Sequence, residues 1–252
     1  MTARMNAQAQ PALINPELDR AQLAATFARD GKVQVADVLR PDFADALYQC
    51  LTHDVPWRLM YYNHGARGPE VVGRIFPEQR AAMSEADMQA LVDKVTGEAR
   101  KEFHYLYEAY DVLDARRRGL DRGLLLQQFL DFMGSDELFD FIRDISGDTE
   151  FNRVDCHACR YLPGHFLKEH ADTSPFEQRH MAYVFYFTRD WHPDFGGLTY
   201  FLDDAGQVTD TFVPSYNSLT LFKVPVAHCV SQVASFAPRP RNSITGWFTR
   251  YN

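Results

Sequence analysis

The character of the sequence changes at FNRVDCHACRYLPGHFLKEHAD, residues 151–172. Before this stretch, apolar residues recur mainly at helical spacing. From residue 151 onward, short β-type runs alternate with turns that contain glycine or proline. Helices followed by strands predict an α+β protein, in which a β-sandwich or barrel carries the functional site and helices pack on one face. The runs that we expect to form strands are FNRVDCHACRYL, HFLKEH, RHMAYVFYFT, GLTYFL, NSLTLFK, AHCVSQV and NSITGWFTRY.

The first part of the chain mixes strand and helix patterns. GKVQVADVL (31–39) predicts a strand, and the following segment predicts a helix that starts at Pro41. PWRLMYYN (56–63) predicts another strand, followed by a loop rich in glycine and proline. Apolar residues three and four apart predict one long helix over 84–117 and two shorter helices within 124–148.

The length of 252 residues and the hydrophobic fraction of 46% fit one globular domain of generous size. We expect a flexible N-terminus over residues 1–18 and a single domain over residues 19–252. Within that domain we expect helical support from 84–148 and the β core from 151–252.

Charge and hydropathy argue against nucleic-acid and membrane partners. The formal net charge is −8 and no run is rich in lysine or arginine, so the basic surface of a nucleic-acid binder is missing. Residues 1–18 lack the apolar core of a signal peptide, and no later run approaches a membrane span. We therefore expect a cytoplasmic protein. We interpret all four cysteines as reduced, because a chain of this length does not depend on a disulfide framework: Cys50, Cys156, Cys159 and Cys229.

The sequence offers several candidate metal ligands in residues 156–172. Cys156 and Cys159 form a CxxC pair, but in a strand residues three apart point to opposite faces, and no second pair completes a zinc site. His170 and Asp172 are two residues apart, so a strand or strand end places them side by side. His165 is the main rival ligand, but it falls on the opposite face of a continuous strand.

A third ligand and an anion-binding residue follow downstream. His228 follows one predicted strand and begins another, and two histidines with one carboxylate form the facial triad of non-haem iron(II) sites. In the last strand, Arg241 shares one face with Ser243, Thr245 and Trp247. An inward arginine needs an anion, and a carboxylate suits its planar guanidinium. The alternative is an arginine at a solvent-exposed strand edge.

Taken in order, these features resemble the iron(II)/2-oxoglutarate-dependent oxygenases, and particularly their prolyl-hydroxylase branch. The matching stretches are RYLPGHFLKEHAD, VFYFTRDWHPDFGGLTYF, AHCVSQV and RNSITGWF. The resemblance covers residues 151–251. It extends more loosely to the N-terminal strand and helix and to FLDFMGSDELFDFIRDISGD (129–148), which is similar to a segment of the ribosomal-protein prolyl hydroxylases.

The resemblance implies a double-stranded β-helix of the jelly-roll or cupin-like type, and it assigns roles to individual residues. His170, Asp172 and His228 would bind iron(II) as the catalytic centre. The far carboxylate of 2-oxoglutarate would be held by Arg241, with help from Tyr186 and Tyr161. Trp247 would line the substrate pocket.

The implied reaction is hydroxylation of an unactivated C–H bond in an amino-acid-type substrate, either a residue of a protein or peptide or a small molecule. Iron(II), 2-oxoglutarate and O2 would take part, with ascorbate as a stimulant, and 2-oxoglutarate would leave as succinate and CO2. Desaturation or ring formation is an alternative outcome. A non-catalytic metal-binding module and a cupin metalloenzyme that does not use 2-oxoglutarate are the competing classes. The sequence does not predict the oligomeric state.

Overall fold

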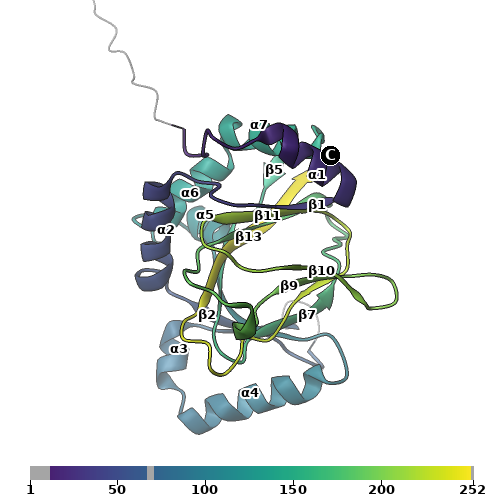
Figure 1. The fold of residues 1–252 in the computed structure, drawn as a ribbon. Helices are drawn as coiled ribbons and strands as arrows, with labels where there is room; N and C mark the ends of the chain where they lie inside the picture. The colour runs from purple at the N-terminus through teal and green to yellow at the C-terminus, as the bar shows by residue number, and fades with distance from the viewer. Residues whose placement is uncertain (1–11, 67–70, 251–252) are drawn as a thin grey trace, which may run out of the picture.

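The computed structural model describes residues 12–66 and 71–250 (Figure 1). Most of the predicted flexible N-terminus, residues 1–18, lies outside the described residues. Within the described part, Ile14 is buried and pairs with Leu39 in an isolated β-bridge. The chain is therefore already packed before residue 18.

One antiparallel sheet curls into a nearly closed barrel and forms the centre of the fold (Figure 1). Its strands follow the order β1-β11-β8-β13-β6-β4-β7-β12-β9-β10, while β2 pairs with β3 and β4, and β5 pairs with β13. This confirms the predicted α+β class with a jelly-roll core. The strands are β1 (Lys32–Val35), β2 (Arg58–Tyr62), β3 (Val72–Ile75), β4 (Tyr105–Asp111), β5 (Arg153–Val154), β6 (His157–Tyr161), β7 (Phe166–His170), β8 (Gln178–Tyr186), β9 (Thr199–Leu202), β10 (Val208–Phe212), β11 (Ser218–Lys223), β12 (His228–Val230) and β13 (Arg241–Arg250).

The helices lie outside the barrel. Helix α1 packs against α7, and α2 packs against α6, whereas α3 and α4 lie at the opposite end of the molecule (Figure 1). Among the described residues, no helix is long and apolar enough to cross a membrane. The helices are α1 (Arg20–Asp30), α2 (Pro41–His53), α3 (Pro77–Ala82), α4 (Glu85–Ala99), α5 (Val112–Arg118), α6 (Leu125–Met133) and α7 (Asp136–Ser146).

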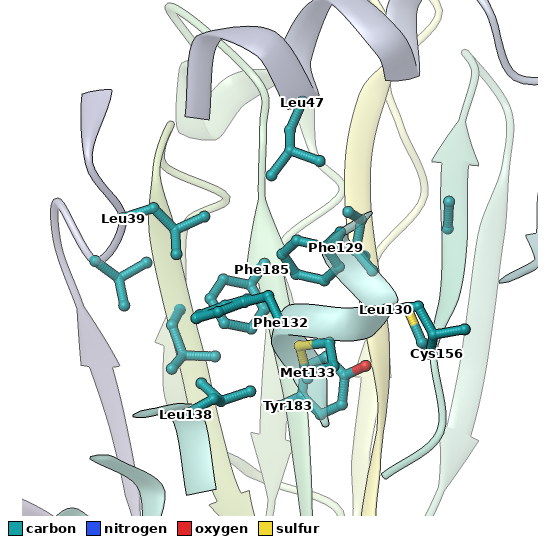
Figure 2. Packing of buried hydrophobic residues seen from close by; sticks show 14 of the residues in the cluster. Leu39, Leu47, Phe129, Leu130, Phe132, Met133, Leu138, Cys156, Tyr183 and Phe185 are labelled. Atoms are coloured by element: carbon teal, nitrogen blue, oxygen red, sulfur yellow. The ribbon is translucent and has the colours of Figure 1, made fainter. Parts of the chain in front are cut away.

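Helix α6 packs its apolar side against the barrel. The ring of Phe129 on α6 meets that of Phe185 on β8 edge-on, with 5.4 Å between centroids, and Figure 2 shows Phe132 on the same helix beside them. The two short helices predicted within residues 124–148 are confirmed as α6 and α7. The side chain of Ser135 caps the N-terminus of α7, and Gly147 ends that helix in the left-handed conformation, at φ 68°.

The single helix predicted over residues 84–117 is wrong in its second half. Helix α4 ends at Ala99, and β4 then enters the sheet between β6 and β7 before α5 begins. Burial along β4 alternates with a period of two, and Leu106, Glu108 and Tyr110 are almost completely buried. Aromatic residues favour strands, and partners on β2, β6 and β7 supply backbone hydrogen bonds. The region expected to support the core with helices therefore contributes a strand to it.

Two further strands were not expected from the sequence. The segment predicted as a loop after residue 63 contains β3, which pairs with β2. Strand β10 pairs with β9, and its side chains are exposed or half-buried, so the sequence lacks the apolar alternation that identifies a strand.

Candidate metal and co-substrate site

The two histidines of the predicted triad face each other across a strand pair. His170 is the last residue of β7 and His228 the first of β12, and the antiparallel register places them directly opposite one another. Their ring centroids are 4.2 Å apart. Residues far apart in the sequence therefore meet because β7 and β12 are neighbours in the barrel.

Asp172 lies just beyond the end of β7 and completes the cluster. Its backbone adopts the left-handed conformation, at φ 56°. The carboxylate Oδ1 lies 3.3 Å from His170 Nε2, and Oδ2 lies 3.3 Å from His228 Nε2. One potential ligand atom from each of the three residues lies within 4.8 Å of the other two. The cluster thus forms at a strand end followed by a turn, and not in a continuous strand.

Backbone contacts orient both imidazoles. The Nδ1 of His170 lies 2.9 Å from the carbonyl oxygen of Lys168, and that of His228 lies 2.9 Å from the carbonyl oxygen of Val226. We assign the ring proton to Nδ1 in each case, which leaves the Nε2 lone pair for a metal. Burial raises the pKa of the Asp172 carboxyl, but the imidazoles outweigh burial and hold that pKa well below its usual range. Two imidazole nitrogens and a carboxylate fit a divalent first-row metal.

Arg241 is buried without an acidic partner. It is 2% exposed, and its guanidinium carbon lies 4.8 Å from the ring centroid of Tyr161 and 5.1 Å from that of Tyr186. Its Nη1 is 3.4 Å from Ser243 Oγ, and its Nε has no hydrogen-bond partner. Among the described residues, no carboxylate oxygen lies within 4.0 Å of the Arg241 guanidinium, so Arg241 forms no ion pair there. An uncompensated buried charge is costly, so this guanidinium is poised to bind an anion.

Gly197 and Tyr186 pack against Arg241, and Tyr186 in turn contacts Thr199. Tyr186 Oη lies 3.0 Å from Thr199 Oγ1, and both residues are buried. Gly197 has φ 63°, and a Cβ added there would lie 2.9 Å from Arg241 Cδ. The sequence indicated Tyr186, but it gave no reason to select Thr199 or to connect Gly197 with the arginine.

A cavity of about 460 Å³ brings the predicted site residues together. The predicted residues that line this cavity are His170, Asp172, His228, Arg241, Tyr161 and Trp247. Tyr186 does not line the cavity but contacts Arg241. Ser243 and Thr245 also line it, as the shared strand face predicts.

Sequence reasoning missed one wall of this cavity. This wall consists of Tyr105 and Tyr107 on β4 and of Phe103, which lies just before that strand. The ring centroid of Tyr105 lies 5.9 Å from that of Phe103 and 5.4 Å from that of Tyr107. The Tyr107 ring stacks on that of Tyr161, with 5.1 Å between centroids. Aromatic residues at every second position were the signal for this wall, but the helical interpretation of the segment concealed it.

Arg179 was also missed. Its guanidinium carbon lies 3.6 Å from the ring centroid of Trp247, and its Nη1 donates to the backbone carbonyl of Asp172 at 3.2 Å. It therefore connects Trp247, which is predicted to line the substrate pocket, with Asp172, which is predicted to bind the metal.

The rejected metal candidates lie apart from the triad. Cys156 packs in the main core between the sheet and the helices, whereas Cys159 packs with Tyr161 on the cavity side, as the opposite-face argument predicts. His165 is buried outside the cluster, and burial lowers its pKa to about 4. All four cysteines are free.

Comparisons with known proteins agree with this arrangement. Residues 156–249 match the family model of the 2OG-Fe(II) oxygenase superfamily. The prolyl 3-hydroxylase OGFOD1 of Mus musculus is 29% identical over 151 residues, which cover 57% of this chain and 26% of the mouse protein. The chain therefore spans only about a quarter of that relative's length.

Solved structures show the same fold. A prolyl-4-hydroxylase of Pseudomonas putida has a TM-score of 0.55 and 20% identity, with 92% of this chain and all of that chain covered. A Trichoplax adhaerens prolyl hydroxylase in complex with a hypoxia inducible factor peptide fragment has a TM-score of 0.59 and 13% identity, with 91% of this chain and 88% of that chain covered. Residues 156–249 therefore match the 2OG-Fe(II) oxygenase superfamily, and the chain has the fold of solved prolyl hydroxylases.

Proposed function

We propose that this protein is an iron(II)- and 2-oxoglutarate-dependent dioxygenase that hydroxylates a C–H bond of an amino-acid residue within a polypeptide. The observation that carries the proposal is the combination, in one cavity, of a His-Asp-His cluster with a buried arginine that has no acidic partner among the described residues. A metal site alone fits many enzymes, but the arginine adds a site for a carboxylate co-substrate.

The family and the cluster together imply Fe(II) and 2-oxoglutarate. When bound, they supply the oxidising chemistry: one atom of O2 enters the substrate C–H bond, and the other enters 2-oxoglutarate, which leaves as succinate and CO2. The contribution of the chain is to bind and orient. The Nε2 atoms of His170 and His228 and the carboxylate of Asp172 would hold the metal. Arg241 would hold the distal carboxylate of 2-oxoglutarate.

The aromatic wall would position the substrate and exclude water from the reacting bond. Tyr105, Tyr107 and Trp247 offer flat apolar surfaces in the same cavity as the proposed metal ligands. Two relatives support a polypeptide substrate. The mouse relative is named as a prolyl 3-hydroxylase, and the Trichoplax adhaerens prolyl hydroxylase was solved in complex with a peptide fragment.

Co-substrate turnover tests this proposal. Purified protein is supplied with Fe(II), 2-oxoglutarate and air, and succinate is measured with and without a pool of random-sequence peptides. We expect succinate formation that requires all three reagents, and a mass gain of one oxygen atom in part of the pool. A protein that binds iron but never consumes 2-oxoglutarate would instead be a non-catalytic module or a metalloenzyme of another class.

A further inference from the structure

The cavity of about 460 Å³ that contains His170, Asp172 and His228 is called the metal cavity below. It adjoins a second, larger cavity. The second cavity has a volume of about 730 Å³. Residues from four strands line both cavities, so the cavities adjoin one another: Met60, Tyr107, His157 and Trp247.

Strand periodicity shows that the cavities lie end to end along one face. On β13, Thr245 lines the metal cavity, Trp247 lines both, and Thr249 lines the second. On β4, Tyr107 lines both cavities, and Asp111 lines the second. Alternate residues of a strand share a face and advance by about 6.6 Å, so an extended chain could follow the strands from one cavity into the other.

The junction carries polar groups that suit a peptide backbone. Trp247 Nε1 is buried and has no hydrogen-bond partner. The ring of His157 lies 5.4 Å from the Trp247 ring, and burial lowers the pKa of His157, which favours the neutral imidazole with one donor and one acceptor.

Most acidic residues of the second cavity are already engaged within the protein. The Asp111 side chain caps α5 by accepting from the backbone N–H of Asp114. Asp114 pairs with Arg118 at 3.4 Å, and Glu177 pairs with Arg179 at 2.8 Å. Asp155 has no ion pair among the described residues, and burial raises the pKa of its carboxyl.

Arginines of the same cavity are not matched in this way. Arg58 packs on the rings of Phe76 and Tyr110, 4.9 and 5.8 Å from their centroids. Three of these arginines form no ion pair within the described ranges, because no carboxylate oxygen there lies within 4.0 Å of their guanidinium groups: Arg58, Arg74 and Arg117. After internal pairing, the cavity wall therefore retains more guanidinium groups than carboxylates.

We infer that the second cavity binds a segment of the substrate polypeptide that carries aspartate or glutamate side chains next to the residue being modified. The inference rests on the proposed function, because it assumes that the substrate enters the metal cavity. The whole chain has a formal charge of −8, which would repel an acidic peptide, so recognition must depend on these local arginines.

Peptide capture tests the inference. Wild-type protein loaded with Fe(II) and 2-oxoglutarate is held without oxygen and incubated with a fully degenerate nonapeptide pool, and the retained peptides are sequenced by mass spectrometry. The same capture is made with Arg58→Gln and Arg117→Gln. Arg29→Gln, on the exposed surface of α1, is the matched control, because it removes the same charge at a distance.

We expect wild type and Arg29→Gln to enrich acidic residues roughly fivefold at defined positions, as one partly exposed ion pair would. Each cavity variant should lose most of that enrichment. Retained peptides with no acidic preference, enrichment of basic residues, or an acidic preference unchanged in both cavity variants would overturn the inference. No retention of peptides above a protein-free blank would also overturn it. Succinate formation in air, measured separately, reports whether the proposed function itself holds.

Discussion

Arg241 in the metal cavity and Arg117 in the second cavity are arginines at opposite extremes of burial. In the metal cavity, Arg241 is 2% exposed and is held by Tyr161 and Tyr186. In the second cavity, Arg117 lies on α5 with an exposed side chain. A buried charge has one fixed geometry and needs a partner, whereas an exposed charge is solvated and contributes little. Burial should therefore decide how strongly each charged residue affects the protein.

The largest difference should come from the metal ligands. Asp172→Ala removes the only carboxylate of the cluster, so we expect iron(II) affinity to fall by more than about 100-fold, the upper end of the loss seen for residues that merely orient ligands. Succinate formation should fall with it. His192→Ala changes an exposed histidine that does not line the cavity, and it should leave both unchanged. Iron titration followed by calorimetry measures this, and equal affinities of the two variants would remove Asp172 from the site.

Replacement of a buried glutamate should also lower the free energy of unfolding more than replacement of an exposed one. Glu108 on β4 is fully buried and pairs with Arg80 and Arg160. Glu108→Gln should lower the free energy of unfolding by about 3 kcal/mol, because two guanidinium groups lose their partner. Glu150→Gln breaks an exposed pair with Arg250 and should cost less than about 1 kcal/mol. Urea denaturation measures both, and a tolerant Glu108 would argue against the position of β4 in the sheet.

The smallest of these effects should be a difference in KM for 2-oxoglutarate between substitutions of two glycines. Gly197→Ala and Gly206→Ala both place a side chain at positive φ, but only at Gly197 would the new Cβ approach Arg241, whereas Gly206 has open space. We expect Gly197→Ala to raise KM for 2-oxoglutarate about tenfold, or ~1.4 kcal/mol, with iron affinity intact. Gly206→Ala should match wild type in KM. Steady-state kinetics measures both KM values, and equal values in the two variants would argue against a role for the close approach of Gly197 to Arg241.

The sequence was informative where pattern and environment agree. The β13 pattern predicted that Arg241, Ser243 and Thr245 share a face, and all three line one cavity. The HxD pair was recognisable by its spacing alone, but pairing with His228 depends on the neighbouring positions of β7 and β12, which no local pattern encodes. The resemblance to a known family supplied that connection.

Strand β4 shows why the remainder could not be predicted. Its apolar residues satisfy a helical spacing as well as a period of two, and the choice is made by backbone partners on β2, β6 and β7. Because β4 was taken for helix, the aromatic wall at Tyr105 and Tyr107 and the route into the second cavity were missed. Thr199 and Gly197 were missed for a related reason, because their importance lies in what they contact.

Binding of 2-oxoglutarate to Arg241→Ala, compared with Arg239→Ala, tests the central claim most directly. Arg239 lies two residues earlier, pairs with Asp190 at 3.1 Å and is partly exposed, so it is a matched arginine outside the cavity. With iron(II) bound and oxygen excluded, the visible band of a chelated 2-oxo acid can be titrated. We predict that Arg241→Ala weakens binding about 30-fold or more, as loss of a buried charge partner does, while Arg239→Ala binds like wild type. Equal affinities in all three proteins would contradict the account.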